Sequence, residues 1–205
     1  MIDSHKRPSL GLSVAANRLS EREVASWHCN GFLVLNEVLT TEDVALLRQA
    51  MDACGLTHEI EKATNQVMHL DLTTLHPAFL ALARDQRILG HVVPLIGPDI
   101  AIEHTKLSAQ PHGPGGGVRW HQDLAFYPHT NSDVLAVMVM LDDATLENGC
   151  MHMIPGSHRL GYLDHAGEDG RFSGACRDHG AWHSHPSQVA ITPRAGGISI
   201  HHGHT

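Results

Sequence analysis

The chain has 205 residues, of which 42% are hydrophobic and 18% charged, and its formal net charge is −8. This composition is typical of a soluble globular protein with one domain, and the acidic balance without a basic cluster argues against a nucleic-acid partner. No apolar run approaches the ~20 residues that cross a bilayer, residues 1–8 lack a signal-peptide core, and four widely spaced cysteines fit a reducing cytoplasm.

The N-terminal residues 1–19 are expected to form a flexible lead-in to a single domain over residues 20–205. Ser20 and Glu23 have the spacing of a capping box, so a helix is predicted to begin there and to end before Asn30-Gly31. The further elements expected in this half are a strand at 32–35, a helix from Thr40 or Thr41, an irregular stretch at 57–75, helices at 78–83 and 87–96, and a strand at 100–108.

One short motif, His121-Gln122-Asp123, suggests chemistry. Residues 118–124 follow a Gly/Pro loop and are predicted to form a short strand, in which side chains two positions apart point to the same face. His121 and Asp123 would then supply two of the three ligands of the 2-His-1-carboxylate triad that holds non-haem Fe(II). With 19 histidines in the chain, such a pair also arises by chance, as it does at His69 and Asp71.

The residues after this motif form a more specific pattern. An apolar run at 134–141, suited to a buried strand, ends in Asp142-Asp143, and a second strand is expected at 151–154. In this region the chain resembles the phytanoyl-CoA dioxygenase family of Fe(II)/2-oxoglutarate oxygenases. The matching blocks are Trp120-His121-Gln122-Asp123, Leu141-Asp142-Asp143, Glu147-Asn148-Gly149-Cys150 and Pro155-Gly156-Ser157-His158.

The resemblance implies a mainly β fold with flanking helices, the double-stranded β-helix or jelly roll of the cupin type. It implies Fe(II) as cofactor, held by His121 and Asp123, with 2-oxoglutarate and O2 as cosubstrates. It also places Lys106 and Ser108 on the strand that faces 2-oxoglutarate, where a cation and a hydroxyl suit a dicarboxylate; a strand with one solvated face is the alternative. Phe126 and Tyr127 would line the substrate pocket, or pack in the core.

The last part of the chain departs from the family pattern. Residues 161–187 form a long polar insertion, expected to be a lid or a disordered connection, and strands are expected at 189–192 and from Ile198. In the family, the second iron histidine comes eleven residues after the first glycine of the final turn. Counted from Gly196, that position is 207, two beyond Thr205, and the 2-oxoglutarate arginine lies further on. The domain is therefore expected to be C-terminally incomplete, with His201, His202 and His204 as alternative ligands.

Together, these features predict an oxygenase that hydroxylates an aliphatic C–H of a small organic substrate and converts 2-oxoglutarate to succinate and CO2. The retained Asp123 favours hydroxylation, because related halogenases replace this carboxylate with a small residue. The rival prediction is a non-catalytic jelly-roll binding module that has lost its third metal ligand. The identity of the substrate and the oligomeric state are not readable from the sequence.

Overall fold

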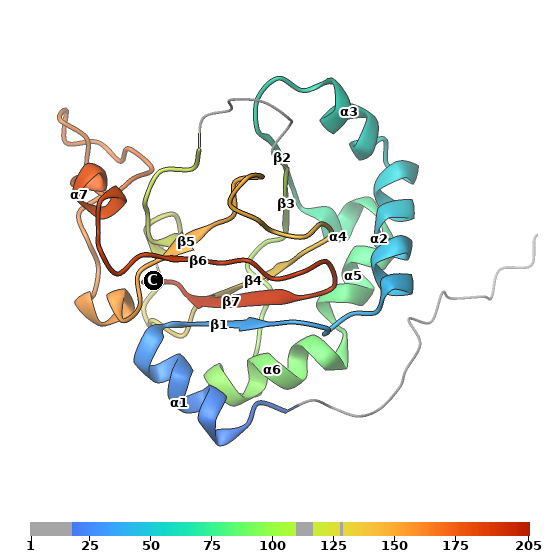
Figure 1. The fold of residues 1–205 in the computed structure, drawn as a ribbon, viewed down its shortest axis with the longest axis horizontal. Coiled ribbons are helices and arrows are strands. Elements are labelled where there is room, and N and C mark those ends of the chain that lie inside the picture. Colours follow the sequence, from blue (N-terminus) through green and yellow to red (C-terminus); the bar gives the residue numbers. More distant parts are fainter. Residues whose placement is uncertain (1–17, 110–116, 128) are drawn as a thin grey trace, which may run out of the picture.

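A three-stranded antiparallel sheet lies at the centre of the fold (Figure 1). The computed structural model describes residues 18–109, 117–127 and 129–205. Strand β7 (Ile198–His202) is the middle strand, between β1 (Phe32–Leu35) and β4 (Leu135–Val139). His201 lies opposite Phe32 on one side and Ala136 on the other. The middle strand therefore has backbone partners on both sides, which makes it a rigid platform for the side chains it carries.

Two smaller antiparallel pairs complete the sheets of the described residues. Strand β2 (Val67–Leu70) pairs with β3 (Lys106–Ala109), and β5 (His152–Met153) pairs with β6 (Val189–Ala190). The helices lie outside these sheets, as the sequence predicts (Figure 1). They are α1 (Glu21–Asn30), α2 (Thr41–Ala53), α3 (Leu56–Lys62), α4 (Leu72–Leu75), α5 (Pro77–Ala83), α6 (Gln86–Ile96) and α7 (His179–His183).

The predicted capping box at Ser20 is present, and the second helix, predicted to start at Thr40 or Thr41, has one as well. Ser20 accepts a hydrogen bond from the backbone N–H of Glu23, whose carboxylate reaches back to the Ser20 N–H. Thr40 and Asp43 form the same reciprocal pair at the start of α2. These caps satisfy N–H groups that a helix start otherwise leaves without partners, so they determine where both helices begin. Helix α1 ends at Gly31, whose positive φ of 82° favours glycine.

Two apolar clusters form the core. One joins the central sheet to α1 and α6 and includes Trp27, Ile88 and the fully buried Ile198 and Ile200; Leu19, from the expected lead-in, also packs into it. The other joins α2 to α5; its buried members are Leu39, Leu47, Ala50, Met51, Leu56 and Phe79. Each fully buried aliphatic or aromatic side chain contributes roughly 1.5–3 kcal/mol relative to exposure, so these clusters attach the helical layer firmly to the sheet.

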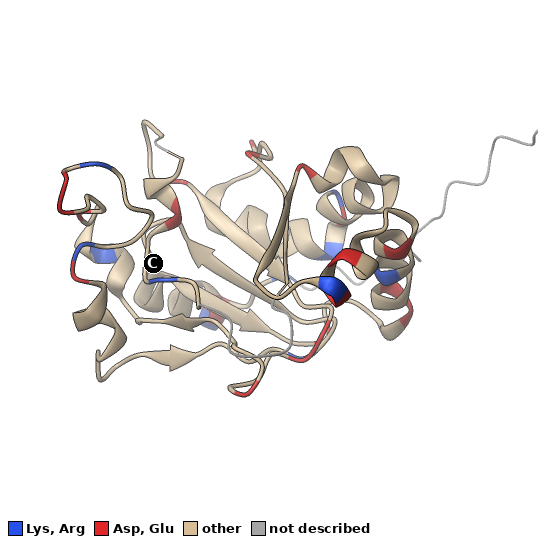
Figure 2. Cartoon of the chain, turned by 90° about the horizontal axis from the view of Figure 1, so that it is seen from above, with Lys and Arg blue, Asp and Glu red and all other residues tan. Residues whose placement is uncertain are grey.

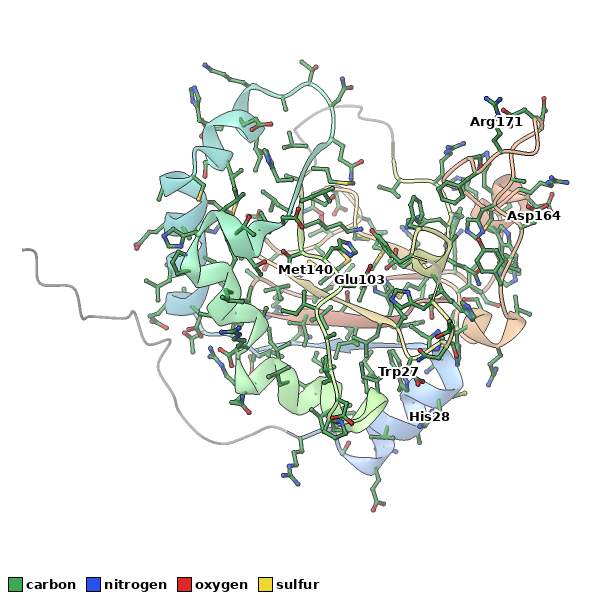
Figure 3. All side chains as sticks on the ribbon, turned by 180° about the vertical axis from the view of Figure 1, so that it is seen from behind. Trp27, His28, Glu103, Met140, Asp164 and Arg171 are labelled. Atoms are coloured by element: carbon green, nitrogen blue, oxygen red, sulfur yellow. The ribbon has the colours of Figure 1, made fainter. Side chains whose placement is uncertain are left out.

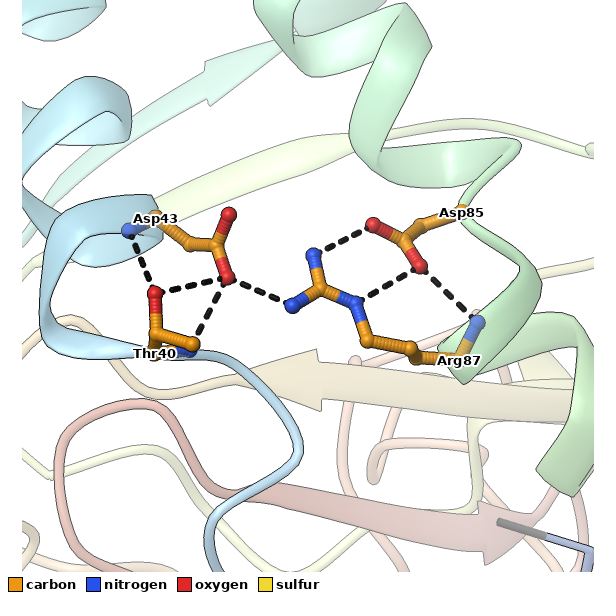
Figure 4. Close-up of polar contacts among 4 residues, drawn as sticks. All are labelled: Thr40, Asp43, Asp85 and Arg87. Atoms are coloured by element: carbon orange, nitrogen blue, oxygen red, sulfur yellow. Dashed lines mark hydrogen bonds and ion pairs between the residues drawn. The ribbon is translucent and has the colours of Figure 1, made fainter. Parts of the chain in front are cut away.

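An ion-pair cluster ties α2 to the start of α6 (Figure 4). The Arg87 guanidinium donates to Asp43 Oδ2 at 2.6 Å and to Asp85 Oδ2 at 2.7 Å. Burial would raise the pKa of the Asp43 carboxyl, but the hydrogen bonds from Arg87 and Thr40 outweigh it and lower that pKa. Because the arginine side chain is itself largely buried, the two carboxylates are the groups that compensate its charge.

Charged residues are scattered over the helices and loops, and the strands carry almost none (Figure 2). In that view the lysine and arginine positions are separated by uncharged and acidic stretches rather than gathered in one basic region. No helix among the described residues is long and apolar enough to pass through a bilayer.

The structure differs from the expected elements in several places. Residues 57–75, expected to be irregular, contain α3, β2 and α4, and the strand expected at 100–108 is reduced to Lys106–Ala109. The reason is pairing: β2 spans four residues, so only four residues of the neighbouring strand have a partner. The apolar run at 134–141 does contain β4, but its five residues are half-buried instead of fully buried.

Candidate metal centre

His121 and Asp123 come together as predicted, but not on a strand. His121 Nε2 lies 3.3 Å from Asp123 Oδ1. The strand predicted at 118–124 is wrong: the chain is irregular up to Gln122 and then forms a 3₁₀ turn at Asp123–Ala125. The turn leaves the backbone free of a strand partner, and its Leu124 N–H instead donates to the Gly203 carbonyl at 2.9 Å. The tight turn, and not a strand, therefore brings the His121 imidazole and the Asp123 carboxylate together.

The two nitrogens of the His121 ring have different roles. Nδ1 lies 2.7 Å from the Arg119 carbonyl oxygen, and a carbonyl only accepts hydrogen bonds, so the ring hydrogen is on Nδ1. Nε2 then faces the carboxylate of Asp123. A ring whose Nδ1–H is held by a backbone carbonyl while Nε2 points at an anionic group has the arrangement of a metal-binding histidine.

The carboxylate of Asp123 has a second histidine partner. His201 Nε2 lies 2.9 Å from Asp123 Oδ2, and both side chains are largely buried. Burial would raise the pKa of Asp123, but the contacts with His121 and His201 outweigh burial and hold that pKa well below its usual range. Burial would also lower the pKa of His121, yet its contacts with Asp123 and the Arg119 carbonyl raise it overall. Asp123 is therefore a fixed negative charge that attracts a positive charge at His121 Nε2.

The pair fits one side of a metal site. Two ligand atoms that bind one metal at right angles, each at about 2.0–2.2 Å, are about 3 Å apart, close to the 3.3 Å between Nε2 and Oδ1. A divalent cation there would replace the proton that Asp123 favours on His121. Among the described residues, no three His, Cys, Asp or Glu side chains are arranged to hold a metal. The described chain thus presents two ligand groups.

The three alternative histidines lie differently. Of these, His201 reaches the candidate site, through Asp123. His202 instead packs near Trp27 and His158, with ring centroids 6.0 and 5.5 Å away. His204 packs on His202, and its Nε2 is buried without a hydrogen-bond partner among the described residues. Neither His202 nor His204 contacts Asp123 through a hydrogen bond or ion pair in the described residues.

Of the residues expected to face 2-oxoglutarate, Lys106 acts on the candidate site. Burial, Asp123 and the Arg119 carbonyl have larger effects on the pKa of His121 than the positive charge of Lys106, which lowers that pKa. Lys106 and Ser108 both lie on the exposed face of β3. The Ser108 hydroxyl accepts a hydrogen bond from the Gln66 side chain at 2.9 Å. Lys106 makes no side-chain hydrogen bond or ion pair within the described residues, which leaves its ammonium group for a ligand.

Two aromatic residues follow the turn, and they face different neighbours. The Phe126 ring meets the His121 ring edge to face at a centroid distance of 5.4 Å, and it is 41% exposed. Tyr127 turns its hydroxyl to His104 Nε2 at 3.0 Å, and their rings lie 4.3 Å apart. Phe126 is therefore directly beside the candidate site, and Tyr127 packs against the segment that leads into β3.

The other His-x-Asp pair does not converge. His69 Nε2 lies 2.9 Å from Glu59 Oε2, from α3. Asp71 has a positive φ of 57° and precedes α4, and its side chain is not paired with His69. This arrangement gives no second candidate for the metal among the described residues.

Comparison with known proteins decides the family. The family model for phytanoyl-CoA dioxygenase matches residues 27–205. The chain belongs to this family. Its predicted family membership is confirmed.

The curated relatives of this chain have substrates that differ from one another. It is 29% identical over 194 residues to a probable alpha-ketoglutarate-dependent hypophosphite dioxygenase of Stutzerimonas stutzeri, with 85% of this chain and 67% of that protein covered. It is 28% identical to an ectoine dioxygenase of Sphingopyxis alaskensis (73% and 53% covered) and 28% identical to an L-proline trans-4-hydroxylase of Streptomyces griseoviridis (69% and 56%). The chain spans between about half and two thirds of the length of these relatives.

Solved structures of similar proteins confirm the predicted fold. The carbocyclase SnoK from nogalamycin biosynthesis superposes with a TM-score of 0.75 at 23% identity, over 92% of this chain and 76% of that one. EctD from S. alaskensis with bound Fe gives a TM-score of 0.68 at 22% identity, over 91% and 69%. The antiparallel sheets with helices outside are therefore those of the jelly-roll double-stranded β-helix.

Gln122, between the two candidate ligands, connects them to distant segments of the chain, and the sequence did not predict this role. Gln122 is 2% exposed. Its side-chain N–H groups donate to the carbonyls of Gly161 and His204, each at 2.8 Å, and its Oε1 accepts from the Leu163 N–H. Its backbone N–H donates to His165 Nε2 at 3.0 Å. The one sequence signal for this role is that Gln122 lies between the two candidate ligands, because a single glutamine forms no recognisable motif.

These bonds anchor the insertion at 161–187, which the sequence predicts as a lid or disordered connection. The structure describes all of it, including α7, and it packs on the candidate site. The Phe172 ring lies edge to face on Phe126 at 4.9 Å, and the Cys176 N–H donates to the Trp120 carbonyl at 2.8 Å. Asp164 and Arg171 mark its outer margin in Figure 3. The insertion is thus a wall of the site with an exposed outer edge.

Proposed function

We propose that this chain carries the iron-binding part of an Fe(II)/2-oxoglutarate-dependent hydroxylase, with His121 Nε2 and Asp123 Oδ1 as two of the metal ligands. The observation that carries this proposal is the directed His121 ring, held at Nδ1 by the Arg119 carbonyl and facing Oδ1 at 3.3 Å. A chance His-x-Asp pair has no reason to show both features, and the pair at His69 and Asp71 shows neither.

Bound Fe(II), with 2-oxoglutarate and O2, would supply the oxidising power that converts a C–H bond to an alcohol while 2-oxoglutarate becomes succinate and CO2. The residues of the chain would do the rest. Asp123 contributes negative charge that partly neutralises the cation. The Arg119 carbonyl keeps the His121 ring in the ligating orientation. Lys106 would bind a carboxylate of 2-oxoglutarate, because it lies on the exposed face of β3 and its ammonium has no ion-pair partner among the described residues. The Ser108 hydroxyl accepts from Gln66 and would keep its own O–H to donate to the same cosubstrate.

The substrate we propose is a small organic molecule with an aliphatic portion that packs against Phe126. The exposed ring of Phe126, beside His121 and Phe172, offers an apolar surface next to the proposed metal. The Tyr127 hydroxyl would contribute only if it left His104. The relatives named above act on hypophosphite, ectoine and L-proline, so small size is the property that their substrates share.

The rival function, a jelly-roll binding module without iron, has one observation in its favour. Among the described residues, two groups and not three are placed to ligate a metal. The family pattern would put the third ligand at a histidine at position 207, followed by the arginine that pairs with 2-oxoglutarate, and a comparison of the chain with a version lengthened by a designed segment that carries these two residues would test this.

The experiment is anaerobic titration with Fe(II), together with succinate formation from 2-oxoglutarate in air. We compare the chain with His121→Ala, Asp123→Ala and the control His69→Ala, each with and without that designed segment after Thr205. The proposal expects iron binding and succinate formation in the extended chain, loss of both in the first two variants, and no change in the control. Iron binding that survives His121→Ala, or is lost in His69→Ala, contradicts it.

A further inference from the structure

The two oxygens of the Asp123 carboxylate face different histidines. Oδ1 lies 3.3 Å from His121 Nε2, outside the usual range of a hydrogen bond but suited to two ligands of one metal. Oδ2 lies 2.9 Å from His201 Nε2, the length of a well-formed hydrogen bond. One carboxylate oxygen thus faces the other proposed metal ligand, and the second oxygen accepts a hydrogen bond.

His201 is the donor in the second contact. An ionised carboxylate only accepts hydrogen bonds, so the hydrogen between the two groups is on His201 Nε2. The other ring nitrogen, Nδ1, is buried and has no hydrogen-bond partner among the described residues. This is the reverse of His121, where a carbonyl holds Nδ1–H and Nε2 is directed at Oδ1. The nitrogen of His201 that reaches the site is therefore engaged with Asp123 and not available as a ligand atom.

We propose that His201 is a positioning residue: it holds Oδ2 of Asp123 so that Oδ1 alone faces the metal. This inference rests on the proposed function, since it assigns a role to His201 only if Asp123 ligates iron. A carboxylate held by one oxygen occupies a single coordination position, which leaves room for 2-oxoglutarate and O2.

The location of His201 in the fold suits this role. It is 7% exposed and sits in β7, opposite Phe32 and Ala136 on the two flanking strands. Asp123, by contrast, begins a short 3₁₀ turn outside the sheet. The hydrogen bond from His201 therefore joins a side chain of a tight turn to the middle strand of the central sheet, which is paired on both sides. Loss of such an outer contact to a metal ligand typically weakens metal affinity by about 10–100-fold.

The test uses Co(II) as the probe, because its absorption reports both binding and ligand geometry. The variants are made in the extended chain defined above. They are His201→Phe, which removes the donor but keeps a ring, His201→Gln, whose amide N–H is placed about where Nε2 is, and His201→Asn, whose amide is one methylene shorter. The control is Ser199→Ala in the same strand, since the Ser199 hydroxyl is buried and has no hydrogen-bond partner within the part of the chain that the structure describes. Circular dichroism of the metal-free proteins checks folding.

We expect His201→Phe and His201→Asn to weaken Co(II) binding about 10–100-fold and to change its absorption spectrum. His201→Gln and Ser199→Ala should stay within a few-fold of the wild type. If His201→Phe does not fold, the Gln and Asn pair decides. Equal Co(II) affinity in all folded variants overturns the inference. An equal loss of affinity in the Gln, Asn and Phe variants also overturns it, because that result would make His201 a ligand. If the wild type binds Co(II) no better than His121→Ala, the proposed function itself fails.

Discussion

The side chain of Gln122 donates to the His204 carbonyl at 2.8 Å, across 82 residues, and to the Gly161 carbonyl at the same distance. It lies between the two proposed ligands and joins their turn to the insertion and to the segment after β7. Because it is almost fully buried, no water is available to replace these partners if the amide is lost.

We expect Gln122→Leu to lower the free energy of unfolding by about 1–3 kcal/mol, since it leaves the carbonyls of Gly161 and His204 and the Leu163 N–H without a partner. Urea denaturation measures the change, and hydrogen exchange should show faster opening of residues 161–187. The matched control is Gln49→Leu on the exposed face of α2, where the effect should be within about 0.5 kcal/mol. Equal losses in the two variants would contradict the anchoring role.

The ion pairs of Arg87 predict a large effect on stability far from the site. Arg87→Met should lower the free energy of unfolding by about 3–5 kcal/mol, because it leaves Asp43 and Asp85 as buried charges without their cation. Arg48→Met is the control, since the Arg48–Asp142 pair is exposed on both sides and such pairs contribute about 0–1 kcal/mol. Denaturation by urea at neutral pH compares the two, and similar losses would refute the distinction.

His202 predicts a loss of stability in mild acid. Burial has the largest effect on the pKa of His202 and, with the charges of His204 and His158, lowers it to about 4. Of the smaller contributions, Asp133 raises this pKa and His201 lowers it. The unfolded histidine titrates near pH ~6.5, so between about pH 6.5 and 4 the unfolded chain binds more protons. Stability should therefore fall as pH falls through this range.

The measurement is the urea midpoint at pH 7 and pH 5. His202→Gln should lose less stability between these two values than the wild type does, because it has no histidine to protonate there. His179→Gln, on the exposed surface of α7, should behave like the wild type. A wild-type loss on acidification that His202→Gln leaves unchanged would assign the effect to other groups.

The proposed role of Lys106 predicts that its loss weakens the binding of 2-oxoglutarate. With the extended chain, Lys106→Ala should raise the KM for 2-oxoglutarate by about 10–100-fold, the loss expected for a hydrogen bond between charged groups, and should leave iron affinity nearly unchanged. Succinate formation at varied 2-oxoglutarate measures it. Lys62→Ala, at the exposed end of α3, is the control. An unchanged KM in Lys106→Ala would mean that β3 only presents a solvated face.

The helices near the N-terminus could be predicted because their signals are local. The capping boxes at Ser20 and Thr40 act between residues three apart, and the start of α5 at Pro77 and the end of α1 at Gly31 depend on the backbone preferences of single residues. The family blocks around His121 were also recognisable, because they combine residue types with a set order and spacing. In these cases the physical cause lies within a few residues of its effect.

The geometry of the site depended on contacts that spacing cannot show. A two-residue alternation predicts a strand at His121–Asp123, but a strand needs a partner, and the backbone here instead turns to reach Gly203. That His201 and not His202 meets Asp123 follows from which face of β7 points toward the turn, a matter of strand register. The packing of the insertion on Gln122 and Phe126 likewise joins residues some 40 positions apart. Such contacts form only when the whole chain has folded, so only the tertiary structure could decide them.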